Sequence, residues 1–136
     1  MFETNINYLA VLAATALSFV FGAGWYTALS KAWLTAVERT PEEVKAVGRP
    51  GWLPFVVAIV LEFVMAYMLA RTIEAVGVTD LSGGLLTGLA AAVGFALPAT
   101  AINYIYPARK AALTLIDGGH WLGVLLIQGA VIGLMG

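Results

Sequence analysis

One acidic residue lies inside an otherwise apolar stretch. Glu62 falls near the middle of FVVAIVLEFVMAYMLA, residues 55–70, and it shares a four-residue spacing with Ala58, Ala66 and Ala70. A carboxyl group facing lipid at mid-depth costs several kcal/mol, whereas a carboxyl group facing other helices can be protonated, paired or hydrogen-bonded. We therefore expect Glu62 to face protein and to bind a proton or a cationic substrate, with a hydrogen-bonded packing role as the structural alternative.

Three other polar residues fall at a similar depth. Counting about 1.5 Å of rise per residue from the centre of each apolar stretch places Ser18, His120 and Gln128 near the level of Glu62. This predicts one central polar cluster, in which Glu62 and His120 could exchange a proton. Asp117, His120 and Glu62 also offer atoms that suit a metal ion, but the sequence has no ligand spacing such as H-E-x-x-H. No metal and no cofactor is expected.

A second polar layer is predicted toward the cytoplasmic side. It contains Trp25, Tyr26, Asn103, Tyr104 and Asp117. Asp117 and His120 are three residues apart, so they share a helix face and extend the layer toward the centre. Arg109 and Lys110 would lie at the cytoplasmic end of this polar layer. The simpler alternatives are interfacial anchoring for the aromatic residues and local hydrogen bonding for Asn103 and His120.

The elements that position these residues are four apolar stretches. The chain has 136 residues, of which 61% are hydrophobic and 11% are charged. Each stretch is long enough to cross a bilayer as a helix, and lipid offers the backbone no hydrogen-bond partners. The predicted fold is an all-α membrane protein, a single antiparallel four-helix bundle over residues 1–136. The predicted spans are about 6–29, 53–73, 82–106 and 112–135, and Gly118-Gly119 leaves a later start of the fourth span, at His120, open.

A short helix is predicted between the first and second spans. In TPEEVKAVG, residues 40–48, Thr40 is a candidate N-cap, Pro41 fits the first helical position and Glu43 completes a capping box. Gly48 is a candidate terminator. We expect this helix to lie on the cytoplasmic membrane surface.

The basic residues indicate an orientation. Six of the seven lie in the first and third connections, and Arg71 lies just before the second connection. The positive-inside rule places the first and third connections in the cytoplasm and both termini outside. The lipid bilayer is the expected surrounding, and the chain lacks a basic patch large enough for nucleic acid.

Small residues recur at every fourth position within the spans, a pattern that favours close helix packing in lipid. The rows comprise Ala10, Ala14, Ser18 and Gly22 in the first span and Gly84, Gly88, Ala92, Ala96 and Thr100 in the third. In the fourth span, Gly129 and Gly133 fit either an intrachain contact or a contact between subunits. Pro98 is expected to kink the third span.

The sequence resembles a known family at several short motifs. They are NYLAVLAATALSFVFGAGWY in the first span, MAYMLA ending the second, INYIY near the end of the third and DGGH early in the fourth. These motifs resemble the bacterial four-span family filed as domain of unknown function seventeen-sixty-one. In that family the Trp-Tyr and Asn-Tyr pairs recur, here Trp25-Tyr26 and Asn103-Tyr104, although Thr27-Ala28 stands where the family usually has a proline. The resemblance implies a multi-pass protein of the bacterial inner membrane and no assigned activity, and Glu62 is not part of its pattern.

No soluble-enzyme motif is present: the sequence has no G-x-S-x-G, phosphate loop or dinucleotide fingerprint. The leading hypothesis is a proton-linked small-molecule transporter or channel-like protein that uses the buried carboxylate. Because four short helices enclose little space, we expect a homo-oligomer or a subunit of a membrane complex. The alternatives are a non-enzymatic accessory or scaffold subunit and a membrane enzyme acting on a lipid or quinone.

Overall fold

The computed structural model describes residues 5–78 and 80–136, which are helical with short connections. The elements are α1 (Tyr8–Ala28), α2 (Ser30–Val37), α3 (Pro41–Lys45), α4 (Leu53–Ala75), α5 (Leu81–Ala91), η1 (Ala92–Ala96), α6 (Leu97–Ile105) and α7 (Ala111–Met135). Four helical segments are long and apolar enough to cross a membrane: α1, α4, the continuous Leu81–Ile105 segment and α7. The four predicted spans are thus confirmed, and the later start of the fourth span is wrong because α7 runs unbroken from Ala111 through His120.

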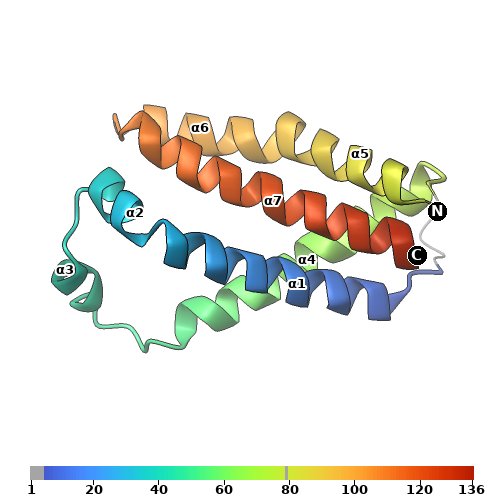
Figure 1. Cartoon of the computed structure of the whole chain (residues 1–136), viewed down its shortest axis with the longest axis horizontal. Helices are drawn as coiled ribbons and strands as arrows, with labels where there is room; N and C mark the ends of the chain where they lie inside the picture. The colour runs from blue at the N-terminus through green and yellow to red at the C-terminus, as the bar shows by residue number, and fades with distance from the viewer. Residues whose placement is uncertain (1–4, 79) are drawn as a thin grey trace.

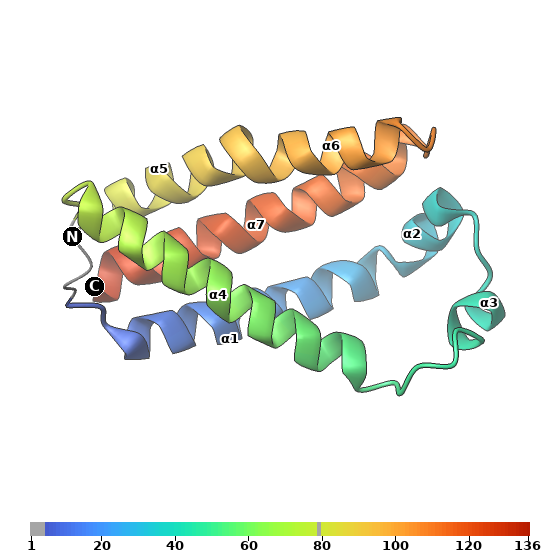
Figure 2. The same ribbon diagram turned by 180° about the vertical axis from the view of Figure 1, so that it is seen from behind.

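Helix α7 lies at the centre of the molecule. It packs against α1, α2, α4, α5, η1 and α6 (Figure 1). The two ends of the described chain lie at the same end of the bundle, where Asn7 Nδ2 donates a hydrogen bond of 2.9 Å to the Met135 carbonyl. Seen from behind, α4 crosses α1 obliquely; it lies beside the start of α5 and diverges from α6 toward the other end (Figure 2).

Glycines allow α5 and α7 to touch at the backbone. A Cβ on Gly84 or Gly88 would collide with the α7 backbone at the carbonyls of Gly129 and Leu125, and a Cβ on Gly129 or Gly133 would collide with the α5 side. Such close approach supplies dispersion contact, which is a main source of helix association in lipid. Gly129 and Gly133 therefore form an intrachain contact.

The small-residue rows mark the buried faces of the helices. The α1 row of Ala10, Ala14, Ser18 and Gly22 is buried throughout. In α4, Glu62 is buried with Ala66 and Ala70. The prediction that Glu62 faces protein is confirmed, since it is 4% exposed.

The third membrane segment is irregular just before Pro98. Residues Ala92–Ala96 form a π-helical turn, in which the Leu97 N–H donates to the Ala92 carbonyl. Pro98 has no N–H to donate, so the α-helical hydrogen bond from residue 98 to the carbonyl four residues earlier is missing whether or not the π-helical turn forms. Thr100 Oγ1 donates to the Ala96 carbonyl at 2.7 Å and satisfies one nearby acceptor.

The connection between the first two spans contains two helices. The predicted capping box is present at α3, where the Thr40 side chain accepts from the Glu43 N–H and the Glu43 side chain accepts from the Thr40 N–H. Helix α3 ends at Lys45, earlier than Gly48, and Gly48 follows it with a φ of 78°. Helix α2 was not predicted, because its residues were assigned to the connection that follows the first span.

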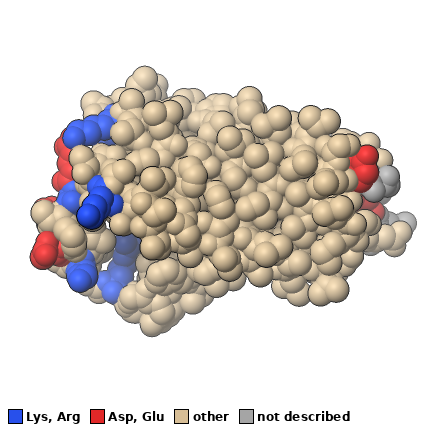
Figure 3. Space-filling model, in the orientation of Figure 1, with Lys and Arg blue, Asp and Glu red and all other residues tan. Residues whose placement is uncertain are grey.

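On the face shown in Figure 3, the charged residues lie at the two ends of the bundle and none is visible between them. The end with α2, α3 and the α6–α7 connection carries Lys31, Arg39, Lys45, Arg49, Arg109 and Lys110. We call it the basic end. This separation of charged ends from an apolar belt is what a membrane-spanning bundle requires.

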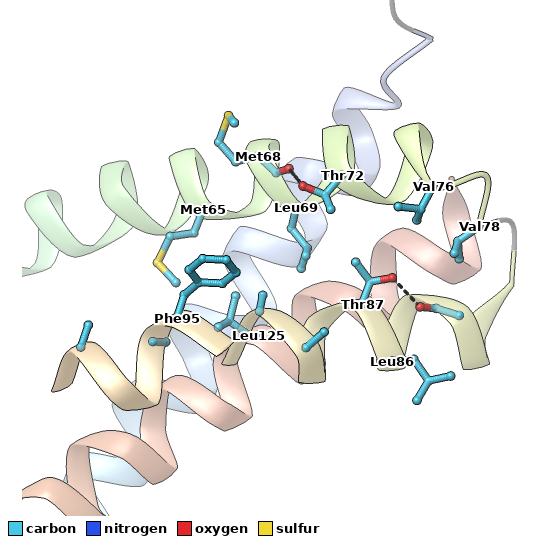
Figure 4. Close-up of a pocket in the computed structure, with 15 residues that line it drawn as sticks. Met65, Met68, Leu69, Thr72, Val76, Val78, Leu86, Thr87, Phe95 and Leu125 are labelled. Carbon is cyan, nitrogen blue, oxygen red and sulfur yellow. Dashed lines mark hydrogen bonds between the residues drawn. The ribbon is translucent and has the colours of Figure 1, made fainter. Parts of the chain in front are cut away.

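A lateral groove of about 860 Å³ opens where α4 diverges from α5, η1 and α6. Met65, Met68, Leu86 and Phe95 are among the side chains that line it (Figure 4). Its two hydroxyl groups donate within their own helices: Thr72 Oγ1 donates to the Met68 carbonyl at 2.9 Å and Thr87 Oγ1 to the Gly83 carbonyl at 2.8 Å. The walls of the groove are therefore apolar.

Candidate functional site

The first polar layer lies where α1, α4 and α7 meet. Gln128 is fully buried, and its Nε2 atom donates to Ser18 Oγ and to the backbone carbonyl of Glu62, both at 3.1 Å. Ser18 Oγ in turn donates to the Thr15 carbonyl at 3.2 Å. The Glu62 carbonyl can only accept, so the amide of Gln128 must point its NH₂ group toward α4. One side chain of α7 thus joins all three helices, and we call Ser18, Glu62 and Gln128 the inner junction.

Two buried oxygen atoms of the inner junction have no hydrogen-bond partner among the described residues. They are Glu62 Oε1 and Gln128 Oε1. Both amide hydrogens of Gln128 are already used, and Ser18 donates its hydroxyl to a backbone carbonyl. Buried polar atoms are usually satisfied, because desolvation without a partner costs about 1–3 kcal/mol. The inner junction therefore has more acceptors than donors.

The second polar layer is centred on Asp117. One carboxylate oxygen accepts from the Tyr26 hydroxyl at 2.6 Å and the other from the Tyr104 hydroxyl at 2.5 Å. The two tyrosines come from α1 and α6, so Asp117 of α7 links three helices just as Gln128 does. Because both oxygens accept, the arrangement satisfies the ionised form of the carboxyl group. Asp117 is 8% exposed, and we call these three residues the tyrosine–aspartate layer.

His120 lies among aromatic side chains beside this layer. Its ring centroid is 4.9 Å from that of Tyr26, 6.2 Å from that of Phe21 and 4.5 Å from that of Trp121. Its Nδ1 atom is buried and has no hydrogen-bond partner among the described residues. The imidazole is thus held by packing rather than by polar contacts.

Glycines of α7 make room for aromatic side chains of α1. A Cβ on Gly119 would lie 2.7 Å from the Trp25 ring, and a Cβ on Gly123 would collide with the Phe21 ring. Trp25 Nε1 also donates to the Ile116 carbonyl of α7 at 2.9 Å. The aromatic residues at the end of the first span therefore serve as specific contacts with α7.

The structure separates residues that the sequence analysis had placed in one cluster. Ser18, Glu62 and Gln128 come together, whereas His120 does not join them. His120 and Gln128 are eight residues apart on α7, which corresponds to about 12 Å along the helix. The geometry therefore does not favour direct proton exchange between Glu62 and His120. The reason is the oblique crossing of α4, which makes depth along α4 a poor guide to depth along α7.

The predicted second layer is present with one exception. Tyr26, Tyr104 and Asp117 are in direct contact, and Trp25 packs beside them. Asn103 is exposed on α6 and takes no part in the layer. It is adjacent to Tyr104 in the chain, and neighbouring positions on a helix point about 100° apart.

Two contributors to the site were not found from the sequence. The backbone carbonyl of Glu62 accepts a hydrogen bond from Gln128, and no sequence pattern identifies which carbonyl will be an acceptor. Phe21 packs on His120 and against Gly123. The four-residue spacing between Phe21 and Trp25, matched by that between Gly119 and Gly123, is a signal that could have indicated this contact.

Comparison with known proteins gives one family match. The family described as "Protein of unknown function (DUF1761)" matches residues 9–133. No curated protein matches the chain, and no solved structure does.

Proposed function

We propose that this chain, which belongs to the DUF1761 family of proteins of unknown function, is a small membrane transporter or channel-like protein whose inner junction binds a proton or a small cation at Glu62. The observation that carries the proposal is the excess of acceptors at the inner junction. Glu62 Oε1 and Gln128 Oε1 are both buried without a donor. A proton or a cation is what such a pair of oxygens can bind.

A single proton would satisfy the inner junction. Protonation converts the Glu62 carboxyl group from an acceptor into a donor, and the free oxygen of Gln128 provides an acceptor on the facing helix. Burial also disfavours the negative charge of an ionised carboxylate. A small cation would satisfy the same two oxygens by direct contact.

A pocket beside α4 lies next to the inner junction. An apolar pocket of about 560 Å³ lies between α1 and α4, and its lining includes Thr15, Phe63 and Val60, which are close in sequence to the inner junction. Because α4 diverges from α6, motion of α4 against the bundle would change the exposure of Glu62 without disrupting the α5–α7 contact. Alternating exposure of this kind is the general requirement for transport.

The expected setting of this activity is the bacterial inner membrane. The basic end would face the cytoplasm and both chain termini would lie outside, following the asymmetry of the lysines and arginines. A homo-oligomer would supply a larger pathway than four helices enclose. The accessory-subunit alternative predicts instead a stoichiometric partner after extraction in mild detergent.

The alternative of a membrane enzyme has less support from the geometry. Asp117 would be its acid or base, but each of its oxygens accepts a tyrosine hydroxyl. His120 is 7% exposed and is enclosed by aromatic rings. Neither group is poised against an open space where a substrate could react.

The test is proton binding and flux with a matched pair of variants. The purified protein is titrated by infrared difference spectroscopy, and vesicles that contain it are subjected to a pH step while internal pH is recorded with a dye. We expect a buried carboxylic-acid band and faster pH equilibration than in protein-free vesicles, both lost in Glu62→Gln. Glu42→Gln removes an exposed carboxylate of α3 and should leave both signals unchanged. Identical spectra and fluxes for wild type and Glu62→Gln would refute the proposal.

A further inference from the structure

We propose a second binding site, at the basic end, that takes the phosphate group of an anionic ligand between two arginines. The site is a pocket of about 220 Å³ lined by Trp33, Val37, Arg39, Tyr104, Arg109 and Leu113. It lies where α2 meets the α6–α7 connection. None of its residues belongs to the inner junction, so the inference does not rest on the function proposed for Glu62.

Arg109 is fixed in position by the backbone of α2. Its Nη2 atom donates to the Val37 carbonyl at 2.7 Å, which holds the guanidinium against the C-terminal end of α2. A guanidinium has five N–H donors, so this contact leaves others available. Arg109 is partly buried and lines the pocket with the Tyr104 ring beside it.

Arg39 faces the same pocket from the other connection. Within the described part of the chain it forms no ion pair, and the acidic residue next to it, Glu38, is 3.6 Å from Lys110 Nζ. Glu38 thus pairs with Lys110 and not with Arg39. The pocket therefore presents two guanidinium groups from separate segments without a carboxylate among its lining residues.

Two guanidiniums that reach one pocket from different segments favour phosphate over a carboxylate. A single arginine fork saturates a carboxylate, whereas phosphate has acceptor oxygens on several sides and can be bound by two forks. The remaining lining fits the organic part of such a ligand. Trp33 and Tyr104 supply aromatic surface, and the Tyr104 hydroxyl is already committed to Asp117.

The position of the pocket allows two sources for the phosphate. It lies at the ends of the spanning helices, the level at which lipid headgroups and interfacial aromatic residues occur. An anionic lipid would enter from the membrane, and a soluble phosphate ester would enter from the water. Their shared chemistry is a phosphate group attached to a small polar unit, and the experiment separates the two.

The experiment measures ligand-induced thermal stabilisation of the full chain in neutral detergent. The probes are short-chain phosphatidylglycerol and soluble glycerol phosphate, with short-chain phosphatidylcholine as the control for a phosphate whose charge is balanced. We expect concentration-dependent stabilisation by phosphatidylglycerol, glycerol phosphate or both, and the pattern identifies the source. Stabilisation by none of the probes, or by phosphatidylcholine as strongly as by phosphatidylglycerol, would overturn the proposal.

Variants test whether the pocket itself is responsible. Arg39→Gln should weaken the apparent affinity about tenfold, the effect of losing one charged hydrogen-bonding partner. Among the described residues the Arg39 side chain makes no hydrogen bond or ion pair, so this variant should fold normally. Arg109→Gln also removes the bond to Val37 and is the secondary test. Arg49→Gln removes an exposed charge at the same end, outside the pocket lining, and should change affinity less than twofold by the same reasoning. An equal loss in Arg49→Gln and Arg39→Gln would show general attraction to the basic end and refute a built site.

Discussion

Gly22 of α1 and His120 of α7 face each other so closely that a Cβ on the glycine would lie 2.7 Å from His120 Nε2. The absence of a side chain at Gly22 is what allows the imidazole to lie against α1. On the same pair of helices, Gly119 makes room for Trp25. Small and large side chains thus alternate across the α1–α7 contact, and each glycine has a large partner on the facing helix.

Replacing Gly22 with alanine should destabilise the bundle. The His120 ring is surrounded by Phe21, Tyr26 and Trp121, so it has little room to withdraw from an added methyl group. We expect Gly22→Ala to lower the free energy of unfolding in detergent by about 1–3 kcal/mol, the usual cost of overpacking. Thermal unfolding followed by circular dichroism measures the change.

Gly24→Ala is the matched control, because a Cβ at Gly24 meets no atom within 4 Å. It should leave stability unchanged or raise it slightly, since alanine favours helix more than glycine does. Combining Gly22→Ala with His120→Ala should cost less than the sum of the single changes. Strict additivity would show that the two residues do not oppose each other.

The tyrosine–aspartate layer should depend on both tyrosine hydroxyls. Tyr26→Phe and Tyr104→Phe each leave one oxygen of a buried carboxylate without its donor, so each should cost about 1–3 kcal/mol of unfolding free energy. Because both act on Asp117, the double variant should show a coupling of at least about 0.5 kcal/mol. Denaturant titration of the four proteins gives the cycle, with Tyr106→Phe as the control for an exposed tyrosine. The prediction is contradicted if Tyr26→Phe and Tyr104→Phe each lose no more unfolding free energy than Tyr106→Phe and if the double variant loses the sum of the two.

The glycine contact between α5 and α7 should be less tolerant than that between α1 and α7. A Cβ on Gly88 meets the Leu125 carbonyl, and backbone cannot rotate away as a side chain can. Gly88→Ala should therefore reach the upper end of the overpacking range, about 3 kcal/mol. Gly94→Ala is the control, because a Cβ at Gly94 meets nothing within 4 Å. It shows whether replacing any glycine of the third span destabilises the protein as much as replacing Gly88. Similar melting temperatures for the two variants would exclude this explanation.

The orientation can be tested with introduced thiols. The chain contains no cysteine, so single replacements give unambiguous labelling. In intact cells, Val76→Cys, which is exposed at the end of α4 opposite the basic end, should react with a membrane-impermeant maleimide. Glu42→Cys in α3 should react only after the cells are lysed, because the positive-inside rule places that connection in the cytoplasm. The reverse labelling pattern would invert the proposed topology.

Much of the fold could be predicted from composition and spacing. The apolar stretches gave four spans to within two residues at each end, since lipid leaves the backbone little choice. The rows through Ser18 and Glu62 identified buried faces, because only small residues allow helices to approach closely. The capping box at Thr40 was readable because it depends on side chains three residues apart.

The parts that could not be predicted depend on how whole helices are placed. Depth counting assumes parallel helices, and it put both His120 and Gln128 near the level of Glu62, whereas in the structure only Gln128 of the two contacts Glu62. The exposure of Asn103 follows from the rotation of α6 about its axis, which the spacing of INYIY leaves undetermined. Helix α2 was missed because it is short and its N-cap, Leu29, makes no side-chain capping bond that the sequence could have indicated.

The central place of α7 bears on how the chain is assembled. Of the four spanning segments, α7 comes last in chain order and packs against the other three, so the surfaces of α1 and α5 that it covers have no partner until α7 is inserted. Before that step α1 and α4 can pack against each other, whereas the contacts of α1, α4 and α5 with α7 form only once α7 is present. Defects in α7 should accordingly be seen first as rapid degradation of newly made protein, before any loss of activity is measurable.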